Sequence, residues 1–398
     1  MAKRISTGID IGTYQVKVIV AEHDETNEQG LPRVIGAGIA ESKGLRHGYI
    51  INSSDVVRAL RSSIAQAEKS SGIKIRRTNL SIGGIGLSSF TSQGSIIISK
   101  ADSEITQLDL DKAIDNAREE LPRNATQNKQ SLHTIPIAYK IDGKLVFGNP
   151  LGMHGDKLEV KVLFINCVEH HIHDLIQAVE ECNVDVDNII ASPLAASFVA
   201  TTKTQKIAGC VLANIGSETV SVVVFENNIP ISLEVFPIGG TDITNDIALG
   251  LKIPLEEAED VKVKHSLGDT VYPRKKLDEI VFARLSDIFD LIEAHLRKIG
   301  RCGLLPAGII LTGGTSGIAT IEEMAKATLK LPSKIAALNI NTQIKNGIVR
   351  DSSWLVSYGL CVFGLSSNDS LPELGMNTPR EKATAASNII SWFKKFLP

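Results

Sequence analysis

Residues 8–20 read GIDIGTYQVKVIV, and residues 212–225 read LANIGSETVSVVVF. Aligned without a gap, residues 9–13 (IDIGT) fall on residues 213–217 (ANIGS), and both copies continue as an alternating apolar strand. The two copies lie half a chain apart, a spacing far longer than that of a solenoid repeat. The repeat therefore predicts two α/β halves, each opening with a strand–turn–strand hairpin, with a cleft between them.

The composition is that of an ordinary globular protein, with 398 residues, 43% of them hydrophobic and 22% charged. This length predicts two or more domains. A net charge of −3 gives no general reason to expect a nucleic-acid partner. The five cysteines form no CxxC pair, which favours a reducing compartment over a disulfide framework or a zinc ribbon. We find neither a signal peptide nor an apolar stretch of the roughly 18 to 20 residues that span a bilayer, and expect a cytosolic chain.

The remaining sequence predicts how elements are arranged around the two hairpins. Between residues 80 and 165, short β segments flank one helix, which indicates a compact α+β module inserted into the first half. In the first half we expect strands over 5–20 and 34–40, a helix over 53–70 capped by Asn52 or Ser53, module strands over 95–99, 132–141 and 158–165, a module helix near 107–120, and a helix over 171–182. In the second half we expect helices over 241–250, 254–265 and 277–299, a strand over 308–311, a buried helix over 354–365 and a polar linker over 366–384.

The turn of the first hairpin has the residue types of a phosphate site. Gly12 lets the backbone approach a ligand, and the N–H groups of Thr13 and Tyr14 can point at phosphate oxygens. Asp10, at the end of the strand, can hold a hydrated Mg²⁺, which prefers one or two carboxylates plus water and phosphate. Taken alone, a plain tight hairpin is the better explanation of this turn. The second copy, with Gly216, Ser217, Glu218 and Thr219, shifts the balance toward phosphate binding.

Two further segments fit the same ligand. Residues 308–318 (GIILTGGTSGI) form an apolar strand followed by Gly313, Gly314 and Thr315, where a nucleotide's base or ribose can lie on the backbone. Glu259 and Lys262 lie three apart on a predicted helix and suit ribose hydroxyls and a base. The alternatives are a strand-to-helix turn for the glycines and a surface ion pair for Glu259 and Lys262.

These four pieces, in this order, resemble the actin-like ATPase superfamily. The inserted segment from SLHTIPIAYKIDG to KLEVKVLFI, the AEDVKVKHSLG helix, AGIILTGGTSGI and the terminal amphipathic segment resemble the bacterial cell-division family FtsA. The resemblance covers nearly the whole chain. It implies an α/β, two-lobed actin-like (RNase H-like) fold with an inserted α+β subdomain and a C-terminal amphipathic helix. It also implies ATP and Mg²⁺ as cofactors, self-assembly into protofilaments, and tethering of the FtsZ ring to the membrane.

The resemblance also implies a division into subdomains, whose boundaries we place as follows. We expect subdomain 1A over 1–80, 166–202 and 350–366, inserted subdomain 1C over 81–165, subdomain 2A over 203–245 and 301–349, subdomain 2B over 246–300, a flexible linker over 367–384 and an amphipathic membrane-targeting helix over 385–398.

The C-terminal residues predict a membrane contact on their own composition. A helix capped by Ser387 is too short to span a bilayer but suits an anionic interface, where each lysine contributes about 1 kcal/mol. The alternative, docking of this helix on its own domain, is disfavoured by the polar linker before it. We therefore expect a peripheral protein on the cytoplasmic side of the inner membrane at the division site. The residues in contact would be Ile389, Ile390, Trp392, Phe393, Lys394, Lys395, Phe396 and Leu397.

A basic run precedes the long helix predicted over 277–299. Arg274, Lys275 and Lys276, with Arg284 on the helix, are equally explained as a solvated face. In FtsA-like proteins this region receives the acidic, hydrophobic C-terminal peptide of FtsZ, so we expect these four residues to bind that peptide.

Two positions predict slow hydrolysis. Efficient members of the superfamily carry an aspartate in the second hairpin and a glutamate just before a Pro-x-Ala-Ala motif near the hinge. Here these positions are Asn214 and Ser192. With Asp10 and a weakened Asn214 as the catalytic pair, and serine unable to act as a strong base, we expect ATP binding with slow or negligible turnover. The alternatives that we weighed are a pilus-assembly actin-like protein and a small-molecule kinase of the same superfamily.

The segment EHHIH (169–173) could suggest a metal site, but the sequence offers no partner cluster for it. A solvated helix start is the better interpretation.

Overall fold

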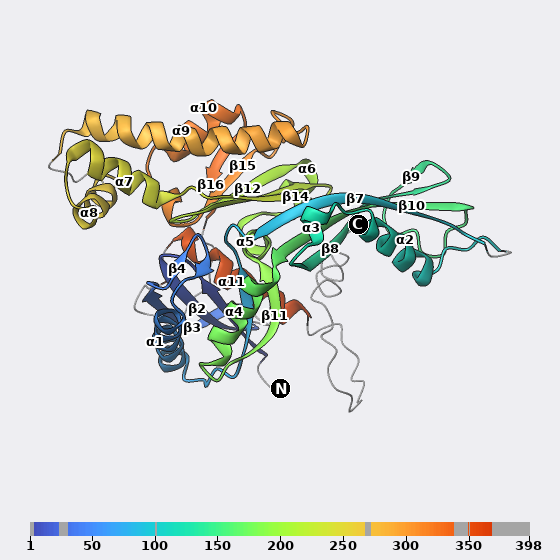
Figure 1. The fold of residues 1–398 in the computed structure, drawn as a ribbon, viewed down its shortest axis with the longest axis horizontal. Helices are drawn as coiled ribbons and strands as arrows, with labels where there is room; N and C mark the ends of the chain where they lie inside the picture. The colour runs from blue at the N-terminus through green and yellow to red at the C-terminus, as the bar shows by residue number, and fades with distance from the viewer. Residues whose placement is uncertain are drawn as a thin grey trace.

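A computed structural model describes residues 4–23, 31–99, 102–266, 272–337, 349 and 351–367. Figure 1 shows two lobes, one containing the blue N-terminal strands and the other the yellow and orange helices, with a teal module extending to one side. Residues 368–398, which hold most of the predicted linker and the whole C-terminal helix, lie outside the described residues. None of the described helices is long and apolar enough to cross a membrane.

The first lobe is built on a five-stranded sheet in the order β11-β6-β1-β2-β3. The hairpin strands β1 and β2 are antiparallel, whereas β1 and β6 are parallel. Helices α1 and α11 pack on opposite faces of this sheet. The elements of the lobe are β1 (Ile5–Ile11), β2 (Gln15–Glu22), β3 (Arg33–Glu41), β4 (Leu45–Arg46), β5 (Tyr49–Ile50), α1 (Ser53–Ser71), β6 (Arg77–Ile82), α4 (Glu169–Glu180), β11 (Asp185–Ala191), α5 (Ser192–Ala200) and α11 (Leu355–Ser367).

Helix α1 confirms the prediction for residues 53–70. The side chain of Asn52 accepts a hydrogen bond from the backbone N–H of Asp55, and the helix ends at Gly72 in the left-handed conformation (φ 71°). The apolar stripe of this helix is buried against the sheet: Val56, Leu60, Ile64 and Ala67.

The second lobe repeats the plan of the first. Its sheet has the order β14-β13-β12-β15-β16, with β12 antiparallel to β13 and parallel to β15. The duplicated α/β architecture that the repeat predicts is therefore confirmed. The strands are β12 (Cys210–Ile215), β13 (Val220–Glu226), β14 (Ile229–Phe236), β15 (Ile309–Thr312) and β16 (Ser333–Ile335).

Five α-helices of the described residues accompany the second sheet, and α7, α8 and α9 lie close to the predicted ranges. The five are α6 (Lys203–Ala208), α7 (Gly240–Leu251), α8 (Leu255–Ser266), α9 (Arg274–Lys298) and α10 (Ile321–Leu329). Helix α9 begins one turn earlier than expected, after Pro273, whose fixed φ suits a helix start. Helices α7 and α10 both pack on α9. The predicted boundary at residue 245 falls inside α7 and remains a prediction.

The inserted module has its own sheet, in the order β7-β10-β8-β9, with α2 packed on one face. The strand expected over 95–99 begins earlier, at Leu87. Its first half was missed because most of its residues are polar, so the sequence there lacks the apolar pattern of a strand. At Gly94 an added Cβ would lie 2.1 Å from the carbonyl oxygen of Ala113, so the glycine allows close strand–helix packing. The elements are β7 (Leu87–Ile97), α2 (Gln107–Glu119), α3 (Arg123–Thr126), β8 (Lys129–Ile141), β9 (Lys144–Val146) and β10 (Lys157–Val168).

Apolar packing and polar contacts hold the lobes and the module together. Phe198 of α5 stacks on Phe363 of α11 at 5.8 Å, and this pair belongs to a core that continues into Leu212 of the second sheet. The hydroxyl of Ser89 in β7 donates to the carbonyl oxygen of Leu233 in β14 at 2.7 Å and accepts from its N–H at 2.9 Å. The module therefore contacts the second lobe as well as the first.

Candidate functional site

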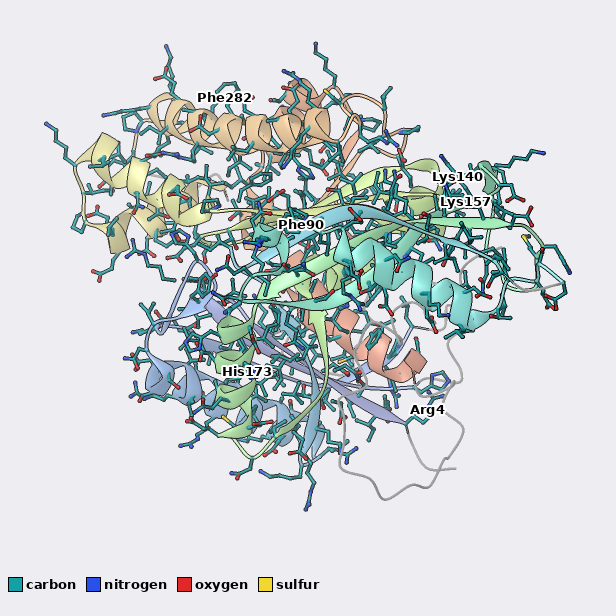
Figure 2. The ribbon with its side chains drawn as sticks, turned by 45° about the vertical axis from the view of Figure 1, so that its right-hand side comes forward. Arg4, Phe90, Lys140, Lys157, His173 and Phe282 are labelled. Atoms are coloured by element: carbon teal, nitrogen blue, oxygen red, sulfur yellow. The ribbon has the colours of Figure 1, made fainter. Side chains whose placement is uncertain are left out.

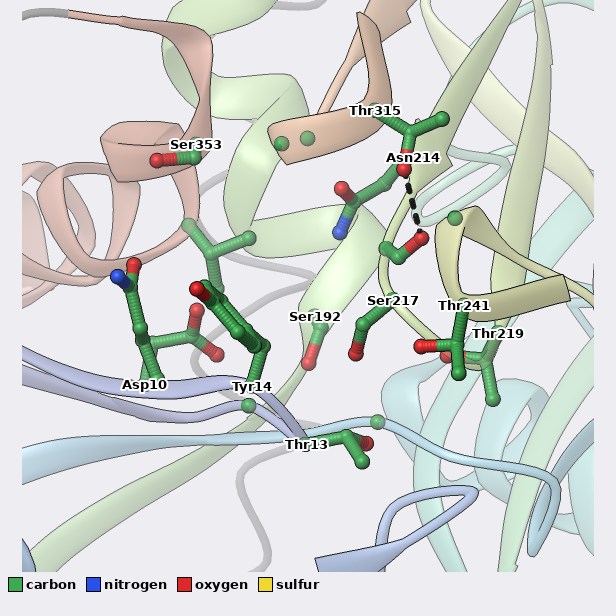
Figure 3. A pocket seen from close by; sticks show the side chains of 18 of the residues that line it. Asp10, Thr13, Tyr14, Ser192, Asn214, Ser217, Thr219, Thr241, Thr315 and Ser353 are labelled. Carbon is green, nitrogen blue, oxygen red and sulfur yellow. Dashed lines mark hydrogen bonds between the residues drawn. The ribbon is translucent and has the colours of Figure 1, made fainter. Parts of the chain in front are cut away.

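A cavity of about 670 Å³ lies where the two hairpins, the glycine loop after β15 and helix α8 meet. Figure 3 shows Asp10 and Thr13 on one side of it and Asn214, Ser217 and Thr315 on another. Its volume lies within the usual range of small-molecule sites, about 300 to 1,000 Å³. All but one of the predicted cofactor residues line it: Gly12, Thr13, Tyr14, Gly216, Ser217, Thr219, Glu259, Lys262, Gly313, Gly314 and Thr315, together with Asp10 and Asn214.

The first hairpin brings a carboxylate and a tight turn to the cavity. The N–H of Gly12 donates to the carbonyl oxygen of Gln15 at 3.1 Å, which closes the turn and places Thr13 and Tyr14 at its tip. Asp10 is half-buried at the end of β1, and the hydroxyl of Ser81 donates to its carboxylate at 2.6 Å. Burial raises the pKa of Asp10, an effect opposed by this hydrogen bond and by the positive charge of Lys17.

Lys17 is a cavity residue that our sequence analysis missed. It is the direct cross-strand partner of Asp10, is 8% exposed, and lies 5.9 Å from the centre of the Trp354 ring. Burial lowers the pKa of Lys17, whereas the negative charges of Asp10 and Asp351 raise it. The signal was available, since a two-strand hairpin with this turn places residue 17 opposite residue 10.

The second hairpin repeats the geometry of the first with neutral side chains. The N–H of Gly216 donates to the carbonyl oxygen of Thr219 at 2.9 Å, as Gly12 does to Gln15. Asn214 is paired across the strands with Ser221, at the positions that hold Asp10 and Lys17 in the first copy. The repeat has thus exchanged a charged pair for a neutral pair on the cavity wall.

Glu218 is the predicted cofactor residue that does not line the cavity. Its carboxylate accepts a hydrogen bond from the backbone N–H of His47 in the first lobe, and its carbonyl oxygen lies 3.2 Å from His47 Nδ1. Its sequence neighbours Ser217 and Thr219 line the cavity, whereas Glu218 does not. The structure thus places Glu218 in contact with the first lobe and outside the cavity lining, and its contact with phosphate remains a prediction.

The third loop rests on the second hairpin. Gly313 has φ 92°, and an added Cβ there would lie 2.4 Å from the carbonyl oxygen of Ile215 and 2.5 Å from Asn214 Oδ1. The hydroxyl of Thr315 donates to the carbonyl oxygen of Gly216 at 2.9 Å. Around Gly314 an added Cβ would meet no atom within 4 Å, so one face of this loop is open.

Glu259 and Lys262 form the i,i+3 ion pair that was the alternative to ligand binding, at 2.7 Å, but both residues also line the cavity as the ligand-binding prediction requires. The ammonium of Lys262 also donates to the carbonyl oxygen of Gly240 at 3.0 Å and to Thr244 Oγ1 at 2.8 Å. Gly240 and Thr241, at the start of α7, also line the cavity and were not predicted. The glycine pair in PIGGTD could have indicated them, because two glycines at a helix start permit close approach of the helix to the second hairpin.

Ser192 lines the cavity at the first residue of α5, and this end of the helix is tied to the inserted module. The backbone N–H of Ala191 donates to Nε2 of the fully buried His133 at 3.0 Å. Burial lowers the pKa of His133 to about 3, so the ring is neutral. His171 donates from Nε2 to the carbonyl oxygen of Gly83, another cavity residue, at 2.9 Å.

The histidines of residues 169–173 do not converge. His171 is buried, whereas the side chain of His173 points to solvent from α4, as Figure 2 shows. Within the described ranges, no group of three or more histidine, cysteine or acidic side chains is placed to hold a metal.

The predicted peptide-binding residues lie on α9, away from the cavity. The Arg284 guanidinium makes two hydrogen bonds to Asp246 of α7, at 2.7 and 3.0 Å, and lies 3.3 Å from Asp287. Lys276 donates to the carbonyl oxygen of Gly250 at 2.6 Å, near the end of α7. Phe282, 60% exposed, points outward from the same helix, as Figure 2 shows.

The arrangement can hold a phosphate-bearing ligand. Turn N–H groups and hydroxyls come from both hairpins, Lys17 supplies a positive charge, and the open face of the third loop can accept a flat group. Asp10 offers the oxygen ligand that a hydrated divalent cation requires.

Comparison with known proteins agrees with this geometry. The pattern of the family described as "Cell division protein FtsA" matches residues 211–359, and that of the "SHS2 domain inserted in FTSA" matches residues 84–166. The FtsA of Pseudomonas aeruginosa is 30% identical, over 91% of this chain and 89% of that protein. This chain belongs to the FtsA family. FtsA proteins of Bacillus subtilis and Escherichia coli K12 are 28% and 27% identical, over 89% and 99% of this chain and 82% and 96% of their own lengths.

Solved structures show that the fold is actin-like. A "PilM-PilN type IV pilus biogenesis complex" chain matches with a TM-score of 0.68 and 14% identity, over 90% of this chain and 98% of that chain. MreB5 of Spiroplasma citri bound to ADP matches with a TM-score of 0.52 and 15% identity, over 90% of this chain and 96% of that chain. At these identities the structures establish the fold alone, so the pilus-assembly alternative gains only an architectural likeness, while the FtsA family places the chain among cell-division proteins.

Proposed function

We propose that this FtsA-family chain binds ATP with Mg²⁺, assembles with copies of itself, and tethers the FtsZ ring to the cytoplasmic face of the membrane at the division site. The observation that carries the proposal is the meeting of two phosphate-type hairpins and an open glycine loop around one cavity. The nucleotide-bound MreB5 structures, with ADP and with AMPPNP, support a nucleotide in a fold of this kind.

Different cavity residues bind different parts of the nucleotide. The turn N–H groups and hydroxyls of Thr13, Ser217 and Thr219 bind phosphate oxygens, and Lys17 offsets their charge. Glu259 accepts hydrogen bonds from ribose hydroxyls, and the open face at Gly314 receives the base. Asp10 would hold a bound Mg²⁺, which would offset the phosphate charge.

Slow hydrolysis follows from two residues of the site that carry no charge. Asn214 offers a carbonyl oxygen but no negative charge to a hydrated cation, and Ser192 cannot take a proton from water at neutral pH. ATP in this chain therefore sets a conformation and supports assembly. The small-molecule kinase alternative needs a catalytic carboxylate facing a substrate hydroxyl, and a phosphate-release assay with candidate sugars tests it.

Two partner surfaces complete the proposal. Phe282, Arg274, Lys275 and Lys276 lie on one helix, and together they offer apolar contact and positive charge to the acidic, hydrophobic C-terminal peptide of FtsZ. The amphipathic segment over 385–398 binds anionic lipid, and polymerisation multiplies this weak contact by avidity.

Two measurements test the function as a whole. Purified full-length chain should bind a fluorescent ATP analogue in the presence of Mg²⁺, and unlabelled ATP should displace the analogue. The full chain should also sediment with vesicles containing anionic lipid, whereas a chain ending at Thr384 should stay in the supernatant. Failure to bind any nucleotide would overturn the ATP proposal, and equal sedimentation of both chains would overturn the membrane proposal.

A further inference from the structure

The second hairpin touches the first lobe through Glu218. This residue lies in the turn between β12 and β13, and His47 lies in the tight turn between β4 and β5. The backbone N–H of His47 donates to the Glu218 carboxylate, and the Glu218 carbonyl oxygen lies 3.2 Å from His47 Nδ1. Both the side chain and the backbone of one residue thus contact the opposite lobe.

The turn that receives Glu218 is firmly seated. The carbonyl oxygen of His47 accepts a hydrogen bond from the N–H of Ile85 at 3.1 Å. Gly48 packs so closely on Gly84 that an added Cβ would lie 2.4 Å from the Gly84 Cα. A contact made to this turn therefore holds the first lobe itself rather than a freely moving loop.

The contact lies at the border of the cavity. The sequence neighbours of Glu218, which are Ser217 and Thr219, line the cavity, and so does Gly48, next to His47. Separating the lobes at this border requires that the Glu218–His47 contact break.

The same contact decides where a negative charge sits. A free carboxylate in a turn that binds phosphate would repel the ligand. The Glu218 carboxylate accepts a hydrogen bond from the backbone N–H of His47, and Glu218 is not among the residues that line the cavity. When the lobes close, the hydrogen bond from His47 to Glu218 forms, and the repulsion between Glu218 and the ligand is removed at the same time.

We infer that Glu218 is a latch that holds the two lobes closed over the cavity and sets how long a nucleotide stays bound. This inference rests on the proposed nucleotide function. It assigns a role to the one predicted cofactor residue that does not line the cavity.

Three substitutions in the full-length chain test the latch: Glu218→Ala, Glu218→Gln and Glu218→Asp. The measurement is the release rate of a fluorescent ATP analogue after mixing with excess ATP. Loss of one charge-assisted hydrogen bond should speed release by roughly 5- to 30-fold in Glu218→Ala. Glu218→Gln should fall between this variant and the parent chain, because its amide oxygen still accepts from His47. Glu218→Asp is too short to reach His47 and leaves its charge near the phosphates, so it should bind more weakly than Glu218→Ala.

A matched control is Glu226→Ala, which removes a carboxylate bound to Arg301 at the other end of β13. Its release rate should equal that of the parent chain. Equal release rates for Glu218→Ala and the parent, or tighter binding by Glu218→Ala, would overturn the latch while leaving nucleotide binding intact. If the parent chain binds no nucleotide, the proposed function itself fails. Should Glu218→Ala unfold, the comparison of Glu218→Gln with Glu218→Asp decides the question.

Discussion

Asp10 and Lys17 are direct cross-strand partners in the first hairpin, and both side chains border the cavity. Little water can screen these two charges from each other, so each charge stabilises the ionised form of the other residue. The same two places in the second hairpin are held by Asn214 and Ser221, which carry no charge. The first hairpin therefore brings a charged pair to the cavity, whereas the second hairpin brings a neutral pair.

Replacing Lys17 tests this dependence. Lys17→Met leaves the Asp10 carboxylate without its positive neighbour and should lower the free energy of unfolding. It should also weaken ATP binding strongly, because Lys262, the second lysine that lines the cavity, is held by Glu259, Gly240 and Thr244. Urea unfolding and fluorescence titration measure the two effects. The double variant Asp10→Asn/Lys17→Met should recover stability but not ATP affinity, and ATP affinity of the parent level in Lys17→Met would contradict the assignment.

Restoring a carboxylate to the second hairpin should increase turnover. We expect the parent chain to hydrolyse ATP more slowly than about one molecule per second, below the ordinary enzyme range. Asn214→Asp supplies the charge that attracts a hydrated cation and should raise the rate by on the order of tenfold with Mg²⁺ present. Phosphate release with and without EDTA is the measurement. A parent rate well above one per second would refute the argument from Asn214.

Two adjacent glycines should respond differently to alanine. Gly313→Ala places a Cβ against backbone and against Asn214, at a φ that alanine rarely adopts, so it should lower the melting temperature markedly. Gly314→Ala meets no atom and should keep the melting temperature of the parent. If the base lies on this loop, Gly314→Ala should still weaken ATP binding. Parent-level ATP affinity in a well-folded Gly314→Ala would exclude that position for the base.

The role of Arg284 is best tested with a charge exchange. Arg284→Glu alone would face Asp246 and Asp287, so it should cost about 1 to 2 kcal/mol of stability and confuse folding with binding. Asp246→Arg/Arg284→Glu restores the pair with reversed charges. Stability should return, while binding of the FtsZ C-terminal peptide, followed by fluorescence anisotropy, should be lost. Unchanged peptide binding in this double variant would remove Arg284 from the site.

His133 should make stability depend on pH. Its folded pKa of about 3 lies below the ordinary value of 6.5, so the unfolded chain takes up a proton that the folded chain does not. Stability is therefore highest above pH 6.5 and falls as the pH drops from 6.5 toward 3. Between pH 7 and pH 5 this histidine accounts for a loss of about 2 kcal/mol.

The variant His133→Asn should show a shallower pH dependence of its urea midpoint, whatever its stability at pH 7. The slope that remains belongs to other groups, including His295, whose pKa burial lowers to about 4. An identical slope in His133→Asn and the parent would mean that His133 is not held neutral in the folded chain.

The sequence predicted the duplicated sheets and most cavity residues because both depend on local patterns. A turn with Gly12 or Gly216 and the alternating strand after it are legible in a dozen letters. Lys17 and Gly240 were missed since their roles come from pairing across strands and from packing between segments. Glu218 was placed in the cavity because its neighbours belong there, whereas the direction of its side chain depends on His47, which is distant in sequence.

The hydroxyl of Ser89 forms hydrogen bonds with both the N–H and the C=O of Leu233. Strand β14 is the last in its sheet, so these two groups would otherwise be available to a strand of another molecule. Ser89 of the inserted module thus protects this sheet edge from pairing with a strand of another molecule. In a protein proposed to work as an ordered assembly, such protection limits contacts between copies to the surfaces that build the polymer.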